Sequence, residues 1–306
     1  MFKTGAWGVE WPTLFMFVVT YTSWVAGTML WEVSPLAAIG ILSLAIAQFS
    51  SLQHEVLHGH PFASKSVNEA MVFPALTLVV PYNRFRDLHL AHHFDPNLTD
   101  PYDDPEANFV DPAVWATLSP FRQGLLRLNN TLFGRIFLGP IIGTFRFVAS
   151  DWRLIRANEP GVAKAWILNG VGVGMVLLWL NTFGNVPLLG YCLAAYFAYG
   201  LLKIRTFLEH RAHDACRARS VVIESRGPLS LLFLNNSFHV VHHSSPNLPW
   251  YKLPALYAEK REYYLRRNDG YMYRSYTEIF RKYLFRAKDP VPHPIWPVAK
   301  TGSEQP

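Results

Sequence analysis

Three short stretches decide the fold of this chain: HEVLHGH at residues 54–60, HLAHH at residues 89–93 and HVVHH at residues 239–243. Together they contain nine of its twelve histidines. Side chains three or four residues apart share one face of a helix, so each stretch is expected to point its imidazoles in one direction. Imidazole is a common metal ligand, and the pattern therefore predicts a metal site.

The number of histidines predicts two metal ions rather than one. A single ion of zinc type takes about four protein ligands. The three stretches offer eight histidines before His60 is counted: His54, His58, His89, His92, His93, His239, His242 and His243. His60 is a possible further ligand, although it stands between Gly59 and Pro61, where a turn can end the helix. Imidazole suits zinc, copper, iron and nickel, so the ligand type alone leaves the metal open.

The composition indicates an integral membrane protein. Half of the 306 residues are hydrophobic and only 16% are charged, which is too apolar for an ordinary soluble chain of this length. A helix needs about 20 apolar residues to cross a bilayer. Four segments are predicted to do so, at about residues 11–30, 35–52, 162–180 and 186–202.

Three further apolar segments are expected at the membrane without crossing it. Residues 71–81 and 229–234 are too short to span and are expected to be re-entrant or interfacial. Residues 131–148 are long enough, but they contain Arg135, Arg146 and the pair Gly139-Pro140. These features favour an interfacial amphipathic helix.

The distribution of basic residues predicts the orientation in the membrane. The two connections expected on the far side, residues 31–34 and 181–185, contain no Lys or Arg. By the positive-inside rule both termini and all three histidine stretches face the cytoplasm, in an inner or plasma membrane. We therefore expect an all-α integral membrane protein with four transmembrane helices and a cytosolic helical cap that carries a histidine-ligated di-metal site.

Other features exclude several classes of protein. Cys192 and Cys216 show no iron–sulfur or zinc spacing. The net charge is +6, and basic residues concentrate at residues 252–288 among many aromatics, which fits anionic lipid headgroups better than nucleic acid. We expect a single domain over residues 1–306, with its core at about 35–260 and a disordered tail at 295–306.

The histidine pattern resembles the three histidine boxes of the membrane fatty acid desaturase superfamily, which includes acyl-lipid desaturases, hydroxylases and carotenoid ketolases. The boxes occur here in the family's order, divided by paired apolar segments, over about residues 35–260. TFLEHR (206–211) and HHSSPNLPWYKLP (242–254) resemble the ketolase branch, whereas HVVHH and the acidic second position of HEVLH are common among acyl desaturases. The resemblance leaves the branch open.

The resemblance implies a non-haem di-iron centre held by histidines at the cytosolic ends of the transmembrane helices. It implies one more ligand upstream of the third box, which falls on His210, with His213 as the nearby competitor. Such a centre uses O2 to oxidise an unactivated C–H bond, a reaction beyond amino-acid side chains. The leading expectation is a double bond in a lipid acyl chain, and the alternative is hydroxylation or ketolation of a carotenoid or other lipid.

Electrons are expected to come from another protein. The sequence shows neither a cysteine set for an iron–sulfur cluster nor a fused haem or flavin domain. We therefore expect a ferredoxin-, rubredoxin- or cytochrome-type donor with its own reductase. Basic residues at 260–267 could dock an acidic donor, although a solvated or lipid-facing basic helix is the simpler explanation.

The first stretch also matches H-E-x-x-H, in which two helical histidines bind zinc and the glutamate is a general base. An intramembrane zinc protease would leave HLAHH, HVVHH and His210 without a role. We therefore expect Glu55 to orient a ligand imidazole instead.

Three further features have simple structural explanations. Asn235 and Asn236 could hold a metal-bound water or begin the helix of the third box. The acidic run at residues 95–104 is expected in turns and caps, with one contact to a ligand histidine as the alternative. His293 is expected to be a tail residue without a role.

Overall fold

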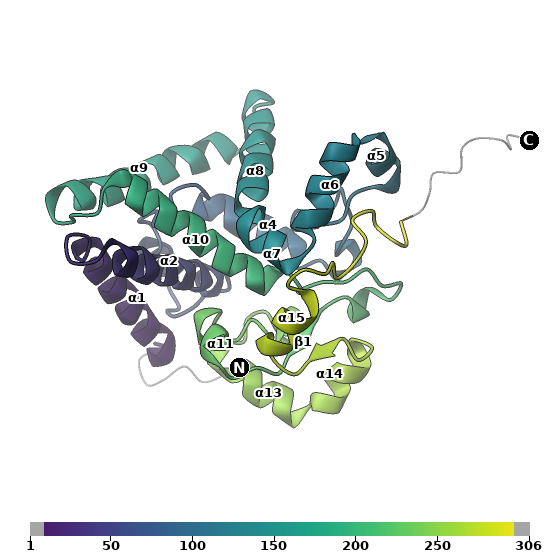
Figure 1. The fold of residues 1–306 in the computed structure, drawn as a ribbon. Coiled ribbons are helices and arrows are strands. Elements are labelled where there is room, and N and C mark those ends of the chain that lie inside the picture. Colours follow the sequence, from purple (N-terminus) through teal and green to yellow (C-terminus); the bar gives the residue numbers. More distant parts are fainter. Residues whose placement is uncertain (1–8, 297–306) are drawn as a thin grey trace, which may run out of the picture.

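A computed structural model describes residues 9–296 of the chain, and this part is mainly helical (Figure 1). The five long helices are α1 (Trp11–Met29), α2 (Pro35–Leu57), α8 (Gly139–Arg156), α9 (Val162–Thr182) and α10 (Leu188–Thr206). The shorter helices are α3 (Lys65–Met71), α4 (Tyr82–His92), α5 (Pro112–Thr117), α6 (Pro120–Asn129), α7 (Leu132–Phe137), α11 (Pro228–Leu232), α12 (His239–Ser244), α13 (Leu253–Glu259), α14 (Arg261–Arg267) and α15 (Tyr276–Tyr283). Short 3-10 turns lie at η1 (Asp95–Asn97), η2 (Cys216–Ala218) and η3 (Trp250–Lys252).

All four predicted membrane segments are helices, namely α1, α2, α9 and α10. α2 packs against both α1 and α10. The α1–α2 approach is close, because a Cβ added at Gly27 would lie 2.9 Å from Leu42 Cγ. By length and composition, two helices of the described chain, α2 and α9, are apolar enough to cross a membrane. α1, which is rich in Thr, and α10, which contains Lys203 and Arg205, do not meet this criterion. The four-span topology therefore stays a prediction.

The segment between α3 and α4, residues 72–81, has irregular backbone and lies against the long helices. Side chains of α10 and α9 satisfy two of its carbonyl groups, since Tyr191 Oη donates to Leu76 O (2.9 Å) and Asn169 Nδ2 to Leu78 O (2.9 Å). Tyr21 Oη of α1 donates to Met71 O, at the end of α3 (2.6 Å). Non-helical backbone at membrane depth needs such partners. The re-entrant or interfacial position of this segment stays a prediction.

The predicted interfacial segment, residues 131–148, forms two helices. α7 ends at Phe137, and α8 begins at Gly139 and continues to Arg156. In Figure 1, α8 runs across the direction of α9 and α10. Large apolar side chains on one side of α7 and α8 are exposed, among them Ile141, Phe145 and Trp152. The opposite face packs on the protein, which agrees with an amphipathic element.

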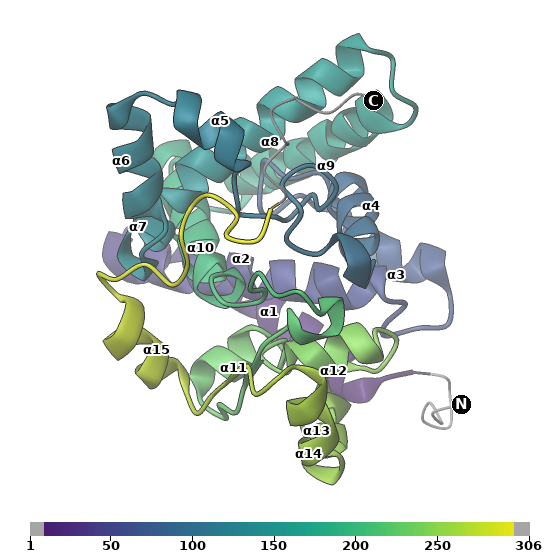
Figure 2. The same cartoon turned by 90° about the vertical axis from the view of Figure 1, so that its right-hand side faces the viewer.

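A cap of α11 to α15 covers one end of the long helices (Figure 2). Two parallel strands, β1 (Val222–Ile223) and β2 (Met272–Tyr273), join its two halves, with Val222 opposite Met272. The all-α prediction is therefore corrected by one small sheet. It forms because the cap brings these distant segments side by side around a core that includes Phe238, Val241 and Leu253.

The end of the chain was predicted to be a disordered tail over residues 295–306. Residues 297–306 lie outside the described part of the structure. Ile295 and Trp296 are described, and the Trp296 ring lies 5.7 Å from the His293 ring and 6.0 Å from the Tyr102 ring between centroids.

Candidate metal centre

The histidine-bearing segments meet at the cap end of the long helices. His54 lies in the last turn of α2, and His58 is the C-terminal cap of that helix. The second histidine stretch forms the end of α4, and the third forms α12. His210 follows the end of α10. Helix ends from distant parts of the chain therefore present their imidazoles to one common space.

Eight of the nine predicted ligands form two groups of four. The first group contains His54, His58, His89 and His242, and the second contains His92, His210, His239 and His243. Within each group, one nitrogen of every imidazole lies within 4.8 Å of the others. Each group takes histidines from at least three separate segments. Either group has the ligand number and type of a transition-metal site.

His93, the ninth predicted ligand, lies beside the first group. Its Nε2 is 2.9 Å from His89 Nε2 and 3.1 Å from His242 Nε2. Its ring also stacks on the ring of His243, with centroids 4.4 Å apart. His93 is therefore placed to give the first group a fifth imidazole while it contacts a member of the second.

Two possible ligands and one dismissed histidine take other positions. His60 joins neither group in the described structure, because its Nδ1 lies 2.8 Å from Glu10 Oε1. His213 faces Asp269 at 3.3 Å and is also outside both groups. His293 was expected to be a tail residue without a role, and its position is instead inside the protein. It is 5% exposed, and its Nε2 lies 3.2 Å from Thr99 Oγ1.

Polar side chains hold three of the candidate ligands from their outer sides. The contacts are His89 Nδ1 to Glu106 Oε1 (2.8 Å), His92 Nδ1 to Asp104 Oδ1 (2.7 Å) and His239 Nδ1 to Asn236 Oδ1 (3.2 Å). Each oxygen accepts a hydrogen bond from an Nδ1–H group, which leaves the lone pair on Nε2. Partners of this kind fix the tautomer and orientation of metal-bound imidazoles. Asn236 thus contacts a histidine ring directly.

Two carboxylates near these ligands, Glu106 and Glu209, were not predicted from the sequence. Glu209 accepts one hydrogen bond from Asn236 Nδ2 (3.1 Å), and its Oε1 lies 3.1 Å from Arg205 Nε and 3.9 Å from His239 Nδ1. Glu209 precedes His210 directly in TFLEHR, and this was its one signal in the sequence. Glu106 follows the acidic run at 95–104, where prolines made turns the simpler expectation.

Glu55 sits behind the first group. Its Oε1 lies 3.7 Å from His54 Nδ1, which is too long for a hydrogen bond, and its Oε2 accepts the backbone N–H of Trp250 at 3.1 Å. The carboxylate therefore connects the end of α2 to the segment after the third histidine stretch. Its contact with a ligand imidazole is weaker than the sequence suggested.

Burial keeps most of these imidazoles neutral. Desolvation, reinforced by neighbouring imidazoles, lowers the pKa of His58 to about 2 and holds the pKa values of His210, His239 and His242 well below 6.5. His92 is different, because Glu106 and Asp104 outweigh its burial and raise its pKa to about 9, so a metal ion at this ring would have to displace the proton on Nε2. Neutral imidazoles carry the free lone pair that a metal needs.

The nitrogen geometry fits metal ions. Within residues 9–296, the buried Nε2 atoms of His54 and His58 have no hydrogen-bond partner. In the second group, His210 Nε2 lies 2.9 Å from His92 Nε2 and 3.0 Å from His239 Nε2. Converging acceptor nitrogens repel each other unless a proton or a cation lies among them. A cation in each group would satisfy these buried atoms.

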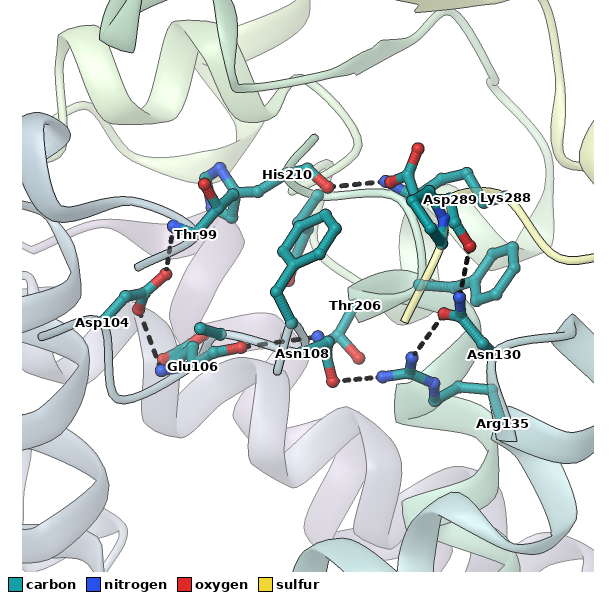
Figure 3. A pocket seen from close by; sticks show the side chains of 15 residues that line it. Thr99, Asp104, Glu106, Asn108, Asn130, Arg135, Thr206, His210, Lys288 and Asp289 are labelled. Carbon is teal, nitrogen blue, oxygen red and sulfur yellow. Dashed lines mark hydrogen bonds and ion pairs between the residues drawn. The ribbon is translucent and has the colours of Figure 1, made fainter. Parts of the chain in front are cut away.

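A polar cavity adjoins the outer side of the second group (Figure 3). Asp104, Glu106 and His210 line one part of it, and Arg135 and Lys288 line another. The residues come from the segment after α4, from α7 with the turn before it, from the end of α10, and from the segment after α15. The cavity thus lies between Asp104 and Glu106 on one side and Lys288 and Asp289 on the other (Figure 3).

A comparison with protein families gives one match. A family model described as fatty acid desaturase matches residues 29–275. No curated protein matches the chain. The matched region contains all three histidine stretches and His210, and it ends before residues 284–296.

Proposed function

The chain belongs to the membrane fatty acid desaturase superfamily, and from this premise we propose that it is an O2-dependent di-iron oxidase that introduces a double bond into a lipid acyl chain. The observation that carries the proposal is the pair of four-histidine groups with converging Nε2 atoms. His93 and the eight grouped histidines would hold the two ions. Bound iron would supply O2 activation and the removal of hydrogen from an unactivated C–H bond.

The residues of the chain prepare this site in two ways. Glu106, Asp104 and Asn236 accept Nδ1–H groups and so direct the Nε2 atoms of three ligands inward. Burial of the histidines excludes bulk water, and the absence of bulk water prevents side reactions at the site. Loss of two hydrogens from the acyl chain, with two protons and two electrons from a donor, balances the reduction of one O2 to two waters.

The zinc-protease alternative is disfavoured by the position of Glu55. A general base has to reach the proton it abstracts. The Glu55 carboxylate instead accepts the Trp250 N–H and lies behind His54. The protease interpretation also gives no role to His92, His239 and the rest of the second group.

An external electron donor and a membrane location complete the proposal. We propose that the site faces the cytoplasm and receives electrons from a small acidic redox protein. α14 offers two exposed basic residues, Arg261 and Arg266, which lie 2.7 Å from Glu224 Oε1 and 3.6 Å from Glu262 Oε2, respectively. Reduction rates that fall steeply with salt would support such docking.

The test is expression with a compatible electron donor, followed by mass spectrometry of total lipids. A product that has lost two hydrogens supports desaturation, whereas a product that has gained oxygen supports hydroxylation or ketolation. The matched control is His242→Ala, which removes one ligand and leaves the membrane helices intact. An oxidised product at the same level in the control would exclude the proposed site.

A further inference from the structure

The segment after α15, residues 284–296, forms a strap along the outer side of the metal centre. It lies beyond the part of the chain that matches the family. Figure 2 shows this yellow segment crossing between the α6–α7 region and the loops near α4. We call residues 284–296 the C-terminal strap.

The strap is fixed by backbone and side-chain hydrogen bonds along its length. Phe133 N donates to Leu284 O (2.9 Å), Asn130 Nδ2 to Asp289 O (2.6 Å), Val110 N to Val291 O (3.0 Å) and His293 N to Val110 O (2.9 Å). The first two bonds hold the strap to α7 and the turn before it. The other two pair it with residues 99–110, the segment that supplies Asp104 and Glu106.

Lys288 connects the strap to one candidate ligand. Its ammonium donates to the backbone carbonyl of His210 at 2.7 Å and lies 2.6 Å from Asp289 Oδ2. The Lys288 side chain is 9% exposed, so a cation is kept inside the protein. Keeping it there is costly unless its partners compensate. The ammonium thus holds the backbone at His210, in the segment that follows α10.

His293 connects the strap to a second candidate ligand through three contacts. Its Nε2 lies 3.2 Å from Thr99 Oγ1, and Thr99 N donates to Asp104 Oδ2 at 2.8 Å. The other oxygen of Asp104 accepts from His92 Nδ1 at 2.7 Å. The ring of His293 also packs edge-on against Phe109, with centroids 4.8 Å apart.

Both connections end at the second histidine group. His210 and His92 belong to that group, and their Nε2 atoms are 2.9 Å apart. In Figure 3, Lys288 and Asp289 lie across the cavity from Asp104 and Glu106. Arg135 bridges the same space through Asn108 and Asn130. Residues 99–110 also reach the first group, because Glu106 accepts from His89 Nδ1 at 2.8 Å, but the contacts of the Lys288 and His293 side chains lead to the second group.

We propose that the C-terminal strap sets the geometry of the second metal site, with Lys288 and His293 as positioning residues. The inference rests on the proposed function, since it assumes that the two histidine groups hold metal. Lys288 acts through the His210 carbonyl, and His293 acts through Thr99 and Asp104. Neither side chain touches the space among the Nε2 atoms.

Four variants test the proposal in the full-length chain. Lys288→Met removes the ammonium, and Lys288→Arg keeps a donor for the His210 carbonyl. His293→Phe keeps the ring packed against Phe109 and removes the nitrogen that contacts Thr99. Lys282→Met is the matched control. Lys282 belongs to α15, outside the strap, and its ammonium lies over the rings of Tyr273 and Tyr283.

The first measurement is binding of iron(II) alone, followed by the metal content after dialysis against a chelator. We expect two binding phases in the parent. Lys288→Met and His293→Phe should weaken one phase about 10- to 100-fold, the usual effect of losing a partner behind a metal ligand. Lys288→Arg should restore much of the affinity, and Lys282→Met should match the parent.

The second measurement is amide hydrogen exchange of the metal-free protein. Exchange at residues 99–110 should rise in His293→Phe, and exchange at residues 207–212 should rise in Lys288→Met. A parent that binds fewer than two irons would contradict the proposed function, while this exchange measurement would still test the strap. Unchanged exchange and iron binding in both variants, or equal weakening of both phases, would overturn the proposal.

Discussion

Arg84 holds Asp151 through two parallel hydrogen bonds of 2.9 Å, although the residues are 67 positions apart. Trp166 Nε1 donates to the same carboxylate at 2.9 Å. The three side chains come from α4, α8 and α9, so one buried carboxylate joins the helix of the second histidine stretch to two others. This contact fixes the direction from which α4 approaches the metal centre.

Asp151→Ala is expected to destabilise the protein strongly. It leaves the Arg84 guanidinium partly buried without its anion, and breaking a buried pair from one side costs roughly 3–5 kcal/mol. Arg84→Lys should cost less, because one hydrogen bond remains available, but it loses the bidentate geometry. Thermal unfolding in detergent measures both. An Asp151→Ala protein as stable as the parent would show that α4 is held by other contacts.

Single histidine substitutions should separate the two metal ions. His242→Ala removes a ligand of the first group, and His239→Ala removes one of the second. Each should lower the iron content from two toward one per chain and abolish oxidation, while the helices remain folded. Metal analysis and circular dichroism check this. One tightly bound zinc in the parent, with His239 dispensable, would contradict the di-iron proposal.

Asp104→Asn and Glu55→Gln should have unequal effects. The Asp104 carboxylate accepts directly from His92 at 2.7 Å, so the amide should lower metal affinity or activity about 10- to 100-fold. Glu55 lies 3.7 Å from His54, and glutamine can still accept from the Trp250 N–H. Glu55→Gln should therefore retain measurable oxidation under saturating iron. Complete loss of product with metal retained would place Glu55 in the catalytic step.

The metal-free protein should lose stability as the pH falls below about 6.5. Burial and the neighbouring imidazoles lower the pKa of His58 to about 2, whereas an unfolded imidazole titrates near 6.5. Between these values the unfolded chain binds protons that the folded chain does not, so acid favours unfolding. His239 and His242, whose pKa values are also lowered, act in the same sense.

His92 opposes this trend, because its pKa is raised to about 9 against the effect of burial. Its contribution is present below pH 6.5 and is lost as the pH rises through about 9. The melting temperature of metal-free parent and His58→Gln, measured across this range, tests both signs. The variant should show a shallower fall in acid. A melting temperature that rises on acidification below pH 6 would refute the assignment of neutral imidazoles.

Topology is the remaining prediction. Tags at Met1 and Pro306 should both report the cytoplasm, because the far-side connections contain no basic residues. Val33, which is 80% exposed between α1 and α2, is a suitable labelling position on the far side. A Val33→Cys variant with Cys192 and Cys216 replaced by Ser should react with an impermeant reagent from outside. External labelling of a Cys at Arg153 instead would require residues 131–148 to cross.

The histidines of the candidate centre and the segments that carry them could be predicted from the sequence alone. Its histidines recur at helical spacing within each stretch, and its apolar segments mark the long helices, because both signals are local. The nine predicted ligands lie together in the structure, with eight of them in two groups. His210 came from the family resemblance, and its position beside His92 and His239 agrees with it.

The tertiary structure alone shows which histidines lie in one group and which side chains hold them. His89 and His92 are three residues apart, yet they belong to different groups, because His89 lies with the α2 histidines and His92 lies with His210, while α12 contributes to both groups. The contacts of Glu106 and His293 could not be predicted from sequence periodicity. Both residues lie in loops, and their hydrogen-bond partners depend on how the loops pack in the folded chain. The small sheet and the strap arise in the same way, from contacts between residues that are distant in the chain and adjacent only once the helices have assembled.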